Sequence, residues 1–272
     1  LHKKPQRPFP MPIQTNDLTI ELRGDQQQIA LITLNRPSKR NALNDGLVLA
    51  IRDVFQGMPH SVRAAVIHGH GEHFCAGLDL SELSERDAAA GLHHSRMWHH
   101  ALDQVERGPV PVVAALHGAV VGGGLELASA CHLRVADTSS FFALPEGSRG
   151  IFVGGGGSVR IPRLIGTARM ADMMFTGRVL NAEEGERAGL AQYLVPQGTA
   201  LDKALELATR IASNAPLTNY ALMQALPRIA DQTADHGFFT EALISAIVQD
   251  APEAKARVRE FLEGRGPKVK KQ

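Results

Sequence analysis

The stretch VPVVAALHGAVVGGGLE, residues 110–126, places a strand, a tight turn and a helix in direct succession. The run from Val110 to Ala115 is apolar and rich in β-branched residues, which predicts a buried strand. The glycines at 122–124 predict the turn, and a helix is expected to begin near Gly124. Free backbone N–H groups at such a helix start favour negative charge on a ligand. We therefore expect a ligand site beside this turn.

The same alternation of strand and helix extends on the N-terminal side of this stretch. The runs Leu18–Leu22 and Ile29–Leu34 predict a β-hairpin. A helix capped by Asn44 and continuing to Phe55 is expected to precede a buried strand at Ala64–Ile67, and another helix is expected around Leu92–Val105. Such alternation is typical of a largely parallel sheet covered by helices. The fold class is therefore predicted to be α/β.

The pattern changes after Gly177. Helical spacing with few β-branched clusters predicts helices over residues 182–188, 199–212, 217–229, 241–248 and 252–263. These helices are expected to form a C-terminal helical region. We accordingly divide the chain into four expected parts. Residues 1–15 form a flexible basic and proline-rich tail, and residues 16–200 form the core that holds the site. Residues 201–265 form the helical region, and residues 266–272 form a second basic tail.

Composition excludes several classes of protein. The 272 residues suffice for one large domain, and the formal net charge of +1 gives no overall field that would attract nucleic acid or a membrane. No run reaches the roughly 18 apolar residues of a membrane helix, and the N-terminal stretch lacks a signal-peptide pattern. Cys75 and Cys131 are too few for a disulfide framework. A soluble protein of the reducing cytoplasm is expected.

Two glutamates are the leading candidates for chemistry. Glu126 and Glu146 each stand beside a glycine-rich turn, Gly122–Glu126 and Leu144–Gly147. Two carboxylates at one site can share acid and base work, and bare glycine amides can hold a developing oxyanion. Each glutamate alone also has a structural explanation, as a partner of the helix dipole or as a solvated loop residue. Together they favour the chemistry of an activated acyl substrate.

A third segment, Phe74–Leu80, follows the expected strand and a polar loop. Its small residues Ala76 and Gly77 let the backbone approach a ligand closely, so the amide of Leu78 could point into a cleft. A strand-to-helix turn often carries glycine for purely structural reasons, so this segment is weak support by itself.

With these motifs together, the chain resembles the crotonase, or enoyl-CoA hydratase/isomerase, superfamily. The segments that carry the resemblance are Leu34–Leu43, Phe74–Leu80, His117–Leu127, Pro145–Leu164, Gly189–Ala191 and Pro252–Gly266. The resemblance implies a crotonase-like spiral of ββα units, followed by helices that build homotrimers, often paired into hexamers.

The resemblance also implies roles for single residues. The backbone amides of Leu78 and Gly123 would form the oxyanion hole for a thioester carbonyl, and two preplaced donors of this kind stabilise an enolate by about 3 kcal/mol or more each. Five residues would lie along the coenzyme A moiety of the substrate: Arg40, Ala42, Ala76, Asp79 and Leu80. No metal and no separate cofactor is implied, because coenzyme A is part of the substrate.

Within the superfamily, the two acid–base positions divide the reactions. Hydratases carry glutamate at both positions, as Glu126 and Glu146 do here, whereas isomerases commonly keep only the second and hydroxycinnamoyl-type hydratase-lyases replace the first. The resemblance therefore favours reversible hydration of a trans-2-enoyl-CoA thioester. Glu126 would help water attack C3, and Glu146 would deliver a proton to C2. Close like charges tend to keep one acid protonated while the other is ionised.

Two segments depart from the usual hydratase pattern. The chain reads GSRGIFVGGGGS over residues 147–158, where hydratases typically have an apolar pair, a proline before the glycines and a Gln-Arg after them. Arg149, three residues from Glu146, either lowers the pKa of that glutamate or faces solvent. The segment Asp87–His100, which lines the acyl pocket in the family, is unusually rich in histidine and contains Trp98. A bulky or aromatic acyl group is one possibility.

Rival functions stay open at this point. The histidines suggest a metalloenzyme, but no pair has the His-x-x-x-His spacing of a helical metal site. Isomerisation or hydrolysis of another acyl-CoA lies within the same superfamily. A crotonase-fold chain that binds RNA or a protein without catalysis is the third alternative, and the near-neutral charge and both glutamates count against it.

Overall fold

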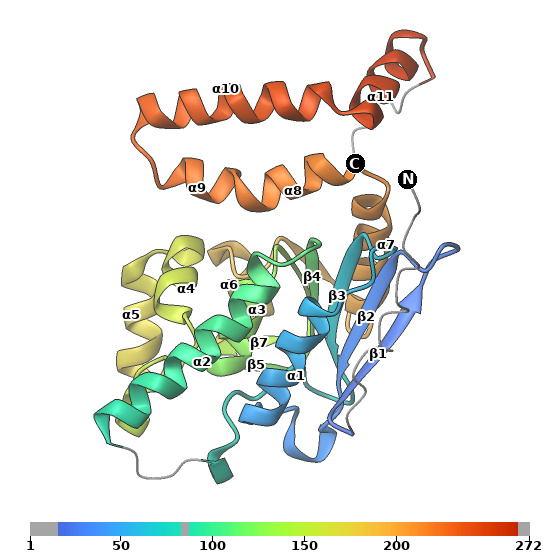
Figure 1. The fold of residues 1–272 in the computed structure, drawn as a ribbon. Coiled ribbons are helices and arrows are strands. Elements are labelled where there is room, and N and C mark those ends of the chain that lie inside the picture. The colour runs from blue at the N-terminus through green and yellow to red at the C-terminus, as the bar shows by residue number, and fades with distance from the viewer. Residues whose placement is uncertain (1–15, 83–86, 266–272) are drawn as a thin grey trace. The chain divides into compact units, whose positions relative to one another are not determined.

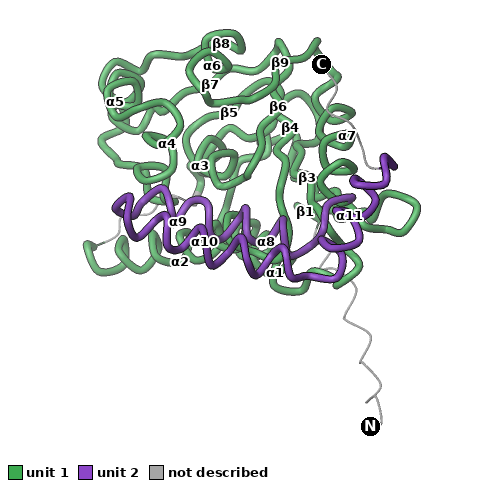
Figure 2. The backbone as a smooth tube through the Cα atoms, turned by 90° about the horizontal axis from the view of Figure 1, so that it is seen from above, with its two compact units in different colours: residues 1–212 green, residues 213–272 purple. Residues whose placement is uncertain are grey.

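The computed structural model describes residues 16–82 and 87–265. The two tails expected at residues 1–15 and 266–272 therefore lie outside the described residues. The chain divides into two compact units, residues 1–212 and 213–272, which Figure 2 colours separately. No described helix is both long enough and apolar enough to cross a membrane.

A six-stranded sheet forms the centre of the first unit, in the order β1-β2-β3-β4-β6-β9. Figure 1 labels the first four of these strands. Its strands are β1 Leu18–Arg23, β2 Ile29–Leu34, β3 Ala64–Gly69, β4 Val112–Leu116, β6 Leu133–Asp137 and β9 Tyr193–Val195. The expected hairpin is confirmed, because β1 pairs antiparallel with β2. Every later neighbour in this sheet is parallel, as the strand–helix alternation predicts.

Helices cover both faces of this sheet, so its inner strands are buried on both sides. On β2, Ile29 and Leu31 belong to a core shared with the helix α7 (Ala200–Ala212). The alternate residues Ala30 and Ile32 face the opposite core, to which helices α1 and α2 contribute. A period of two along the strand thus places successive side chains in different cores.

Three helices lie on the face of the sheet to which Ala30 and Ile32 point. They are α1 (Asp45–Gln56), α2 (Ala88–Glu106) and α3 (Gly123–Ala130). The predicted cap at Asn44 is confirmed, since its side-chain oxygen accepts the Leu47 N–H at 2.8 Å. The helix expected at 92–105 begins earlier than its apolar spacing indicates, because Asp87 caps it by accepting the Ala90 N–H at 2.7 Å. The first residues of α1 and α2 are therefore determined by their capping side chains and not by the spacing of apolar residues.

A second, three-stranded sheet holds the turns that carry the glutamates. It consists of β5 (Ala119–Val121), β7 (Phe141–Ala143) and β8 (Leu180–Asn181), with β5 and β7 parallel. The chain passes from β4 to β5 and then into α3, and from β6 to β7. These repeats confirm the expected ββα spiral. The sequence interpretation missed β5 as a strand and treated it as part of the glycine turn, because three residues are too few to show a period.

The remaining helices of the first unit are α4 (Gly157–Ile165), α5 (Thr167–Thr176) and α6 (Ala182–Ala188). The helix α7 also belongs to this unit, because its buried face packs on the sheet. The expected start of the C-terminal helical region at residue 201 thus differs from the observed division after Ala212. Helical spacing alone does not tell which neighbour a helix packs against.

The second unit contains only helices among its described residues. They are α8 (Pro216–Gln224), α9 (Leu226–Ala230), α10 (Ala234–Asp250) and α11 (Pro252–Leu262). The single helix expected at 217–229 is divided into α8 and α9, with Pro227 in the first turn of α9, where proline is tolerated. The presence of C-terminal helices is confirmed.

Candidate active site

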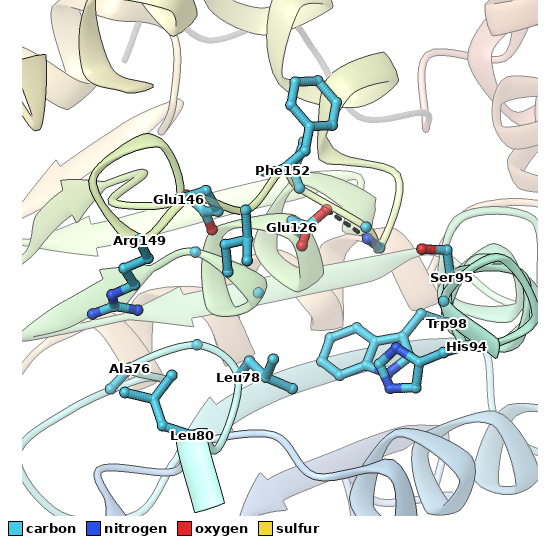
Figure 3. A pocket seen from close by; sticks show the side chains of 18 residues that line it. Ala76, Leu78, Leu80, His94, Ser95, Trp98, Glu126, Glu146, Arg149 and Phe152 are labelled. Carbon is cyan, nitrogen blue, oxygen red and sulfur yellow. Dashed lines mark hydrogen bonds between the residues drawn. The ribbon is translucent and has the colours of Figure 1, made fainter. Parts of the chain in front are cut away.

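A cavity of about 340 Å³ opens in the first unit where four chain segments meet. Figure 3 shows Glu126 and Glu146 near its centre, with Leu78 on one side and Trp98 and His94 from α2 on another. The lining residues come from the loop at 76–80, from α2, from the start of α3 and from the segment at 146–155. The two glutamates, 20 residues apart in the sequence, therefore share one pocket.

Glu126 lies in the first turn of α3 with only 4% of its surface exposed. Its carboxylate oxygen Oε1 accepts two backbone N–H groups, from Gly155 and Gly157, both at 2.8 Å. Burial raises the pKa of this carboxyl, while the two amides favour its charged form and act in the opposite direction. The Glu126 side chain also lines the pocket.

Glu146 follows β7 and is 7% exposed. Its oxygen Oε2 is buried and has no hydrogen-bond partner among the described residues. Burial is the largest cause that raises its pKa to about 7, the Glu126 charge raises it further, and Arg149 opposes the rise. Near neutral pH this carboxyl therefore holds a proton for a large fraction of the time.

Two backbone amides face the same space. A Cβ added at Gly123 would lie 3.5 Å from the Leu78 nitrogen, so the two peptide nitrogens are close neighbours. The Gly77 carbonyl accepts the Leu43 N–H at 2.7 Å, and the Asp79 N–H donates to the Leu43 carbonyl at 2.8 Å. Because residues 77 and 79 both pair with Leu43, the N–H of Leu78 between them points away from Leu43. Within residues 16–82 and 87–265, neither the Leu78 nor the Gly123 N–H donates a hydrogen bond. Both are available to an oxyanion.

The α2 side of the pocket is formed by side chains that the sequence interpretation did not assign individually. The Trp98 ring lies against Gly123 and Gly155, where an added Cβ would lie 3.2 and 3.1 Å from ring carbons. Its indole Nε1 donates to Asp45 Oδ1 at 3.1 Å, and His94 Nε2 contacts the same oxygen at 2.8 Å. The i,i+4 spacing of His94 and Trp98 was visible in the sequence, but their shared partner on α1 was not.

Comparison with known proteins identifies the family of the chain. A family model described as enoyl-CoA hydratase/isomerase matches residues 24–272. The chain belongs to the enoyl-CoA hydratase/isomerase family. The crotonase resemblance of the sequence is thereby confirmed.

Solved structures and curated relatives support the same family membership. A putative enoyl-CoA hydratase from Rhodopseudomonas palustris is 58% identical with a TM-score of 0.89, and the match covers 92% of this chain and 95% of that one. The 2,3-dehydroadipyl-CoA hydratase of Escherichia coli is 32% identical over 90% of this chain and 96% of its own length. The (E)-benzylidenesuccinyl-CoA hydratase of Thauera aromatica is 32% identical over 88% and 94%, respectively.

In this family member, the residues expected along coenzyme A fall into two groups. Ala76 and Leu80 line the pocket. Arg40, Ala42 and Asp79 are outside the set of lining residues, in or beside the adjoining loop, where the Arg40 carbonyl accepts the Ala76 N–H at 2.9 Å. Contact of these three with coenzyme A stays a prediction.

Asp79 has a clear structural role in this loop. It is 5% exposed, and its Oδ2 accepts from Arg36 at 2.8 Å. The Ser81 hydroxyl donates to Oδ1 at 2.7 Å and, with the Arg36 contact, holds the Asp79 pKa at about 2. Arg36 also donates to the Ala42 carbonyl, so Asp79 and Ala42 are joined through one guanidinium.

The described residues bear on two rival chemistries, metal binding and a cysteine nucleophile. In the ranges 16–82 and 87–265, no three or more His, Cys, Asp or Glu side chains are grouped to hold a metal ion. The histidines at 93, 99 and 100 do not line the glutamate pocket. Cys75 is fully buried, and burial raises the pKa of its thiol to about 12, so it is unsuited to act as a nucleophile.

Proposed function

We propose that this protein is an enoyl-CoA hydratase, a hydro-lyase that adds water reversibly across the 2,3 double bond of a trans-2-enoyl-CoA. The observation that supports this most strongly is the convergence of Glu126 and Glu146 on one pocket that also holds the free Leu78 and Gly123 amides. Hydration needs an acid, a base and a site for the developing enolate oxygen at once. This pocket contains groups suited to all three.

In the proposed mechanism, the thioester oxygen accepts the two amides and becomes negative as water adds to C3. Glu126 takes the proton from the attacking water in its ionised form, which the Gly155 and Gly157 amides favour against the burial that raises its pKa. Glu146, whose pKa burial raises to about 7, holds the proton that goes to C2. Water supplies the hydroxyl at C3, and one proton is exchanged between the carboxyls and solvent, so the reaction balances without a separate cofactor.

The test is a panel of enoyl-CoA thioesters with straight, branched, carboxylate-terminated and aromatic acyl groups. The loss of the conjugated chromophore reports hydration, and analysis of the product distinguishes it from other reactions. A 3-hydroxyacyl-CoA is the expected product. A shifted double bond would assign the protein to the isomerases, and free coenzyme A would assign it to the hydrolases.

Arg149 gives a prediction for the pH dependence of this reaction. The positive charge of Arg149 lowers the pKa of Glu146, which burial raises to about 7. Since Glu146 must be protonated to donate, kcat/KM of the wild type is expected to fall as pH rises through about 7. In Arg149→Gln, the pKa of Glu146 rises, so the falling limb moves to higher pH. Arg149→Lys keeps the charge and is the matched control; an unmoved limb in Arg149→Gln would contradict this coupling.

We further propose that the protein assembles as a homotrimer or as a hexamer, as the family resemblance implies. Exposed apolar side chains follow one face of α10 at a spacing of four, Phe239, Leu243 and Ile247, with exposed fractions of 68, 50 and 56%. Such a stripe is typical of a surface that is covered by a partner.

The assembly is tested by placing a charge on this face. Leu243→Glu is expected to lower the sedimentation mass of the protein from a multiple of the chain mass towards 29.3 kDa, because a buried carboxylate without a partner is costly. Gln249→Glu adds the same charge on α10 outside the stripe and should leave the mass unchanged. A wild-type monomer at micromolar concentration would refute the assembly.

Location in the cytoplasm is likewise part of this proposal.

A further inference from the structure

The carboxylate of Glu126 is held by a loop that has no side chains of its own. The loop consists of the glycines at 154–156 and leads into Gly157, the first residue of α4; the N–H groups of Gly155 and Gly157 hold Glu126 Oε1 at 2.8 Å. Glycine has the largest backbone freedom of any residue, so such a run has little intrinsic tendency to keep one conformation. Something outside the loop must therefore fix the direction of these amides.

Arg160 contacts this loop from the side away from the substrate pocket. Its Nη1 donates to the Gly155 carbonyl at 3.0 Å, and its side chain is 11% exposed. Arg160 does not line the pocket that holds the two glutamates. It therefore acts on the loop without touching the space in which a substrate would lie.

Glu106 fixes Arg160 in turn. The Arg160 Nε donates to Glu106 Oε2 at 2.7 Å, and Glu106 is the last residue of α2. The same helix carries Trp98, whose ring lies against Gly155. The ion pair thus joins α4 to α2 across the glycine loop, and its partly buried, charge-assisted geometry resists rotation of the guanidinium.

The backbone of the loop is fitted to this arginine. Gly156 has a φ of +98°, and a Cβ added there would overlap the Arg160 guanidinium. A side chain at 156 would therefore both strain the backbone and displace the cation. Glycine at position 156 therefore avoids both costs.

We infer that Arg160, anchored by Glu106, is a positioning residue that sets the orientation of the Glu126 carboxylate through Gly155. This inference rests on the acid–base role proposed for Glu126. The charge of Arg160 also acts on Glu126 directly: burial is the largest influence and raises the pKa of Glu126, and Arg160 is among the groups that lower it. Removal of the cation thus loosens the loop and disfavours the ionised base.

The kinetic test compares Arg160→Gln and Arg160→Lys with the wild type. A misplaced catalytic group costs up to about 100-fold in rate, so Arg160→Gln is expected to lower kcat by roughly 10- to 100-fold. KM for the thioester should change by less than about 3-fold, because Arg160 does not line the substrate pocket. Glu106→Gln keeps the Gly155 contact and is expected to show a smaller loss.

The second readout is the titration of the Glu126 carboxyl itself, followed by carbon-13 NMR without substrate. Because Arg160 lowers the pKa of Glu126, Arg160→Gln is expected to move this titration to higher pH. Arg160→Lys keeps the charge and should leave the titration near that of the wild type while recovering only part of kcat. This measurement is independent of which product the enzyme forms, so failure of the proposed reaction and failure of this inference are distinguishable.

Arg163→Gln is the matched control, since Arg163 is exposed on the same helix and its loss removes an equal charge. It should leave kcat and the Glu126 titration unchanged. A folded Arg160→Gln variant with wild-type kcat and an unmoved titration would overturn the inference. A lower melting temperature with no change in either readout would also overturn it, because Arg160 would then serve stability alone.

Discussion

Replacement of Glu146 by glutamine is expected to lower kcat for hydration at least about 100-fold, and Glu126→Gln is expected to do the same. Glutamine keeps the size of the side chain but can neither release nor take up a proton. Because both side chains act on the reacting atoms and not on the nucleotide part of the substrate, affinity for free coenzyme A should stay near that of the wild type. Steady-state kinetics together with calorimetric titration of coenzyme A measure both quantities.

The free energy of unfolding shows whether the Glu146→Gln variant is folded and whether burial of Glu146 is costly in the wild type. In the wild type, the pKa of Glu146 rises from 4.5 to about 7 on folding, so the ionised form is disfavoured in the folded protein. Stability from this group is present below pH 4.5 and is lost as pH rises through about 7. Glu146→Gln is therefore expected to be more stable than the wild type at pH 8, by up to about 3 kcal/mol, with little difference at pH 4.5.

Wild-type turnover in either glutamine variant would remove that residue from the mechanism. The variant Glu72→Gln serves as a control, because Glu72 is an exposed carboxylate in a loop outside the lining residues of the pocket. Its kcat should remain within about 2-fold of the wild type, as expected for a surface substitution.

Gly77→Ala is the second substitution for which we expect a large effect. Gly77 has a φ of +96°, and an added Cβ would lie 2.8 Å from the Val121 carbonyl oxygen, beside the Gly123 nitrogen. Relief of this clash must shift the Leu78 amide relative to Gly123. Loss of one oxyanion donor typically lowers kcat by about 100- to 1000-fold, so a decrease of at least about 100-fold is expected.

Gly177→Ala separates backbone strain from damage to the oxyanion hole. Gly177 also has a positive φ, +70°, but no atom lies within 4 Å of an added Cβ there, and the residue does not line the pocket. Both variants should lose about 1–3 kcal/mol of unfolding free energy through strain. Only Gly77→Ala should lose kcat; equal kinetics in the two variants would show that the Leu78 amide does not bind the oxyanion.

Local patterns predicted much of the fold because they carry their own physical cause. Asn44 is a cap residue in front of an apolar helix, and the structure shows its side chain in that role. The first four residues of β3 and all of β4 form continuous apolar runs, as expected for strands covered on both faces. Short elements escaped prediction: β5 has three residues, which show no period.

The composition of the site was predictable only in part. Glu126 and Glu146 stand out in the sequence because each carboxylate adjoins a glycine turn, and the pocket indeed contains both. The contact of Trp98 and His94 with Asp45 joins residues more than 45 positions apart, and nothing in their local sequence indicates it. The Arg160–Gly155 contact is equally invisible, because a main-chain carbonyl has no sequence signature.

The central claim is tested most directly by incubating crotonyl-CoA with the protein in water enriched in oxygen-18 and analysing the product by mass spectrometry. The proposed function predicts 3-hydroxybutyryl-CoA with one heavy oxygen at C3, formed at a rate that falls at least about 100-fold in Glu126→Gln and Glu146→Gln. An unlabelled isomer of the substrate, or free coenzyme A with labelled crotonate, would contradict it.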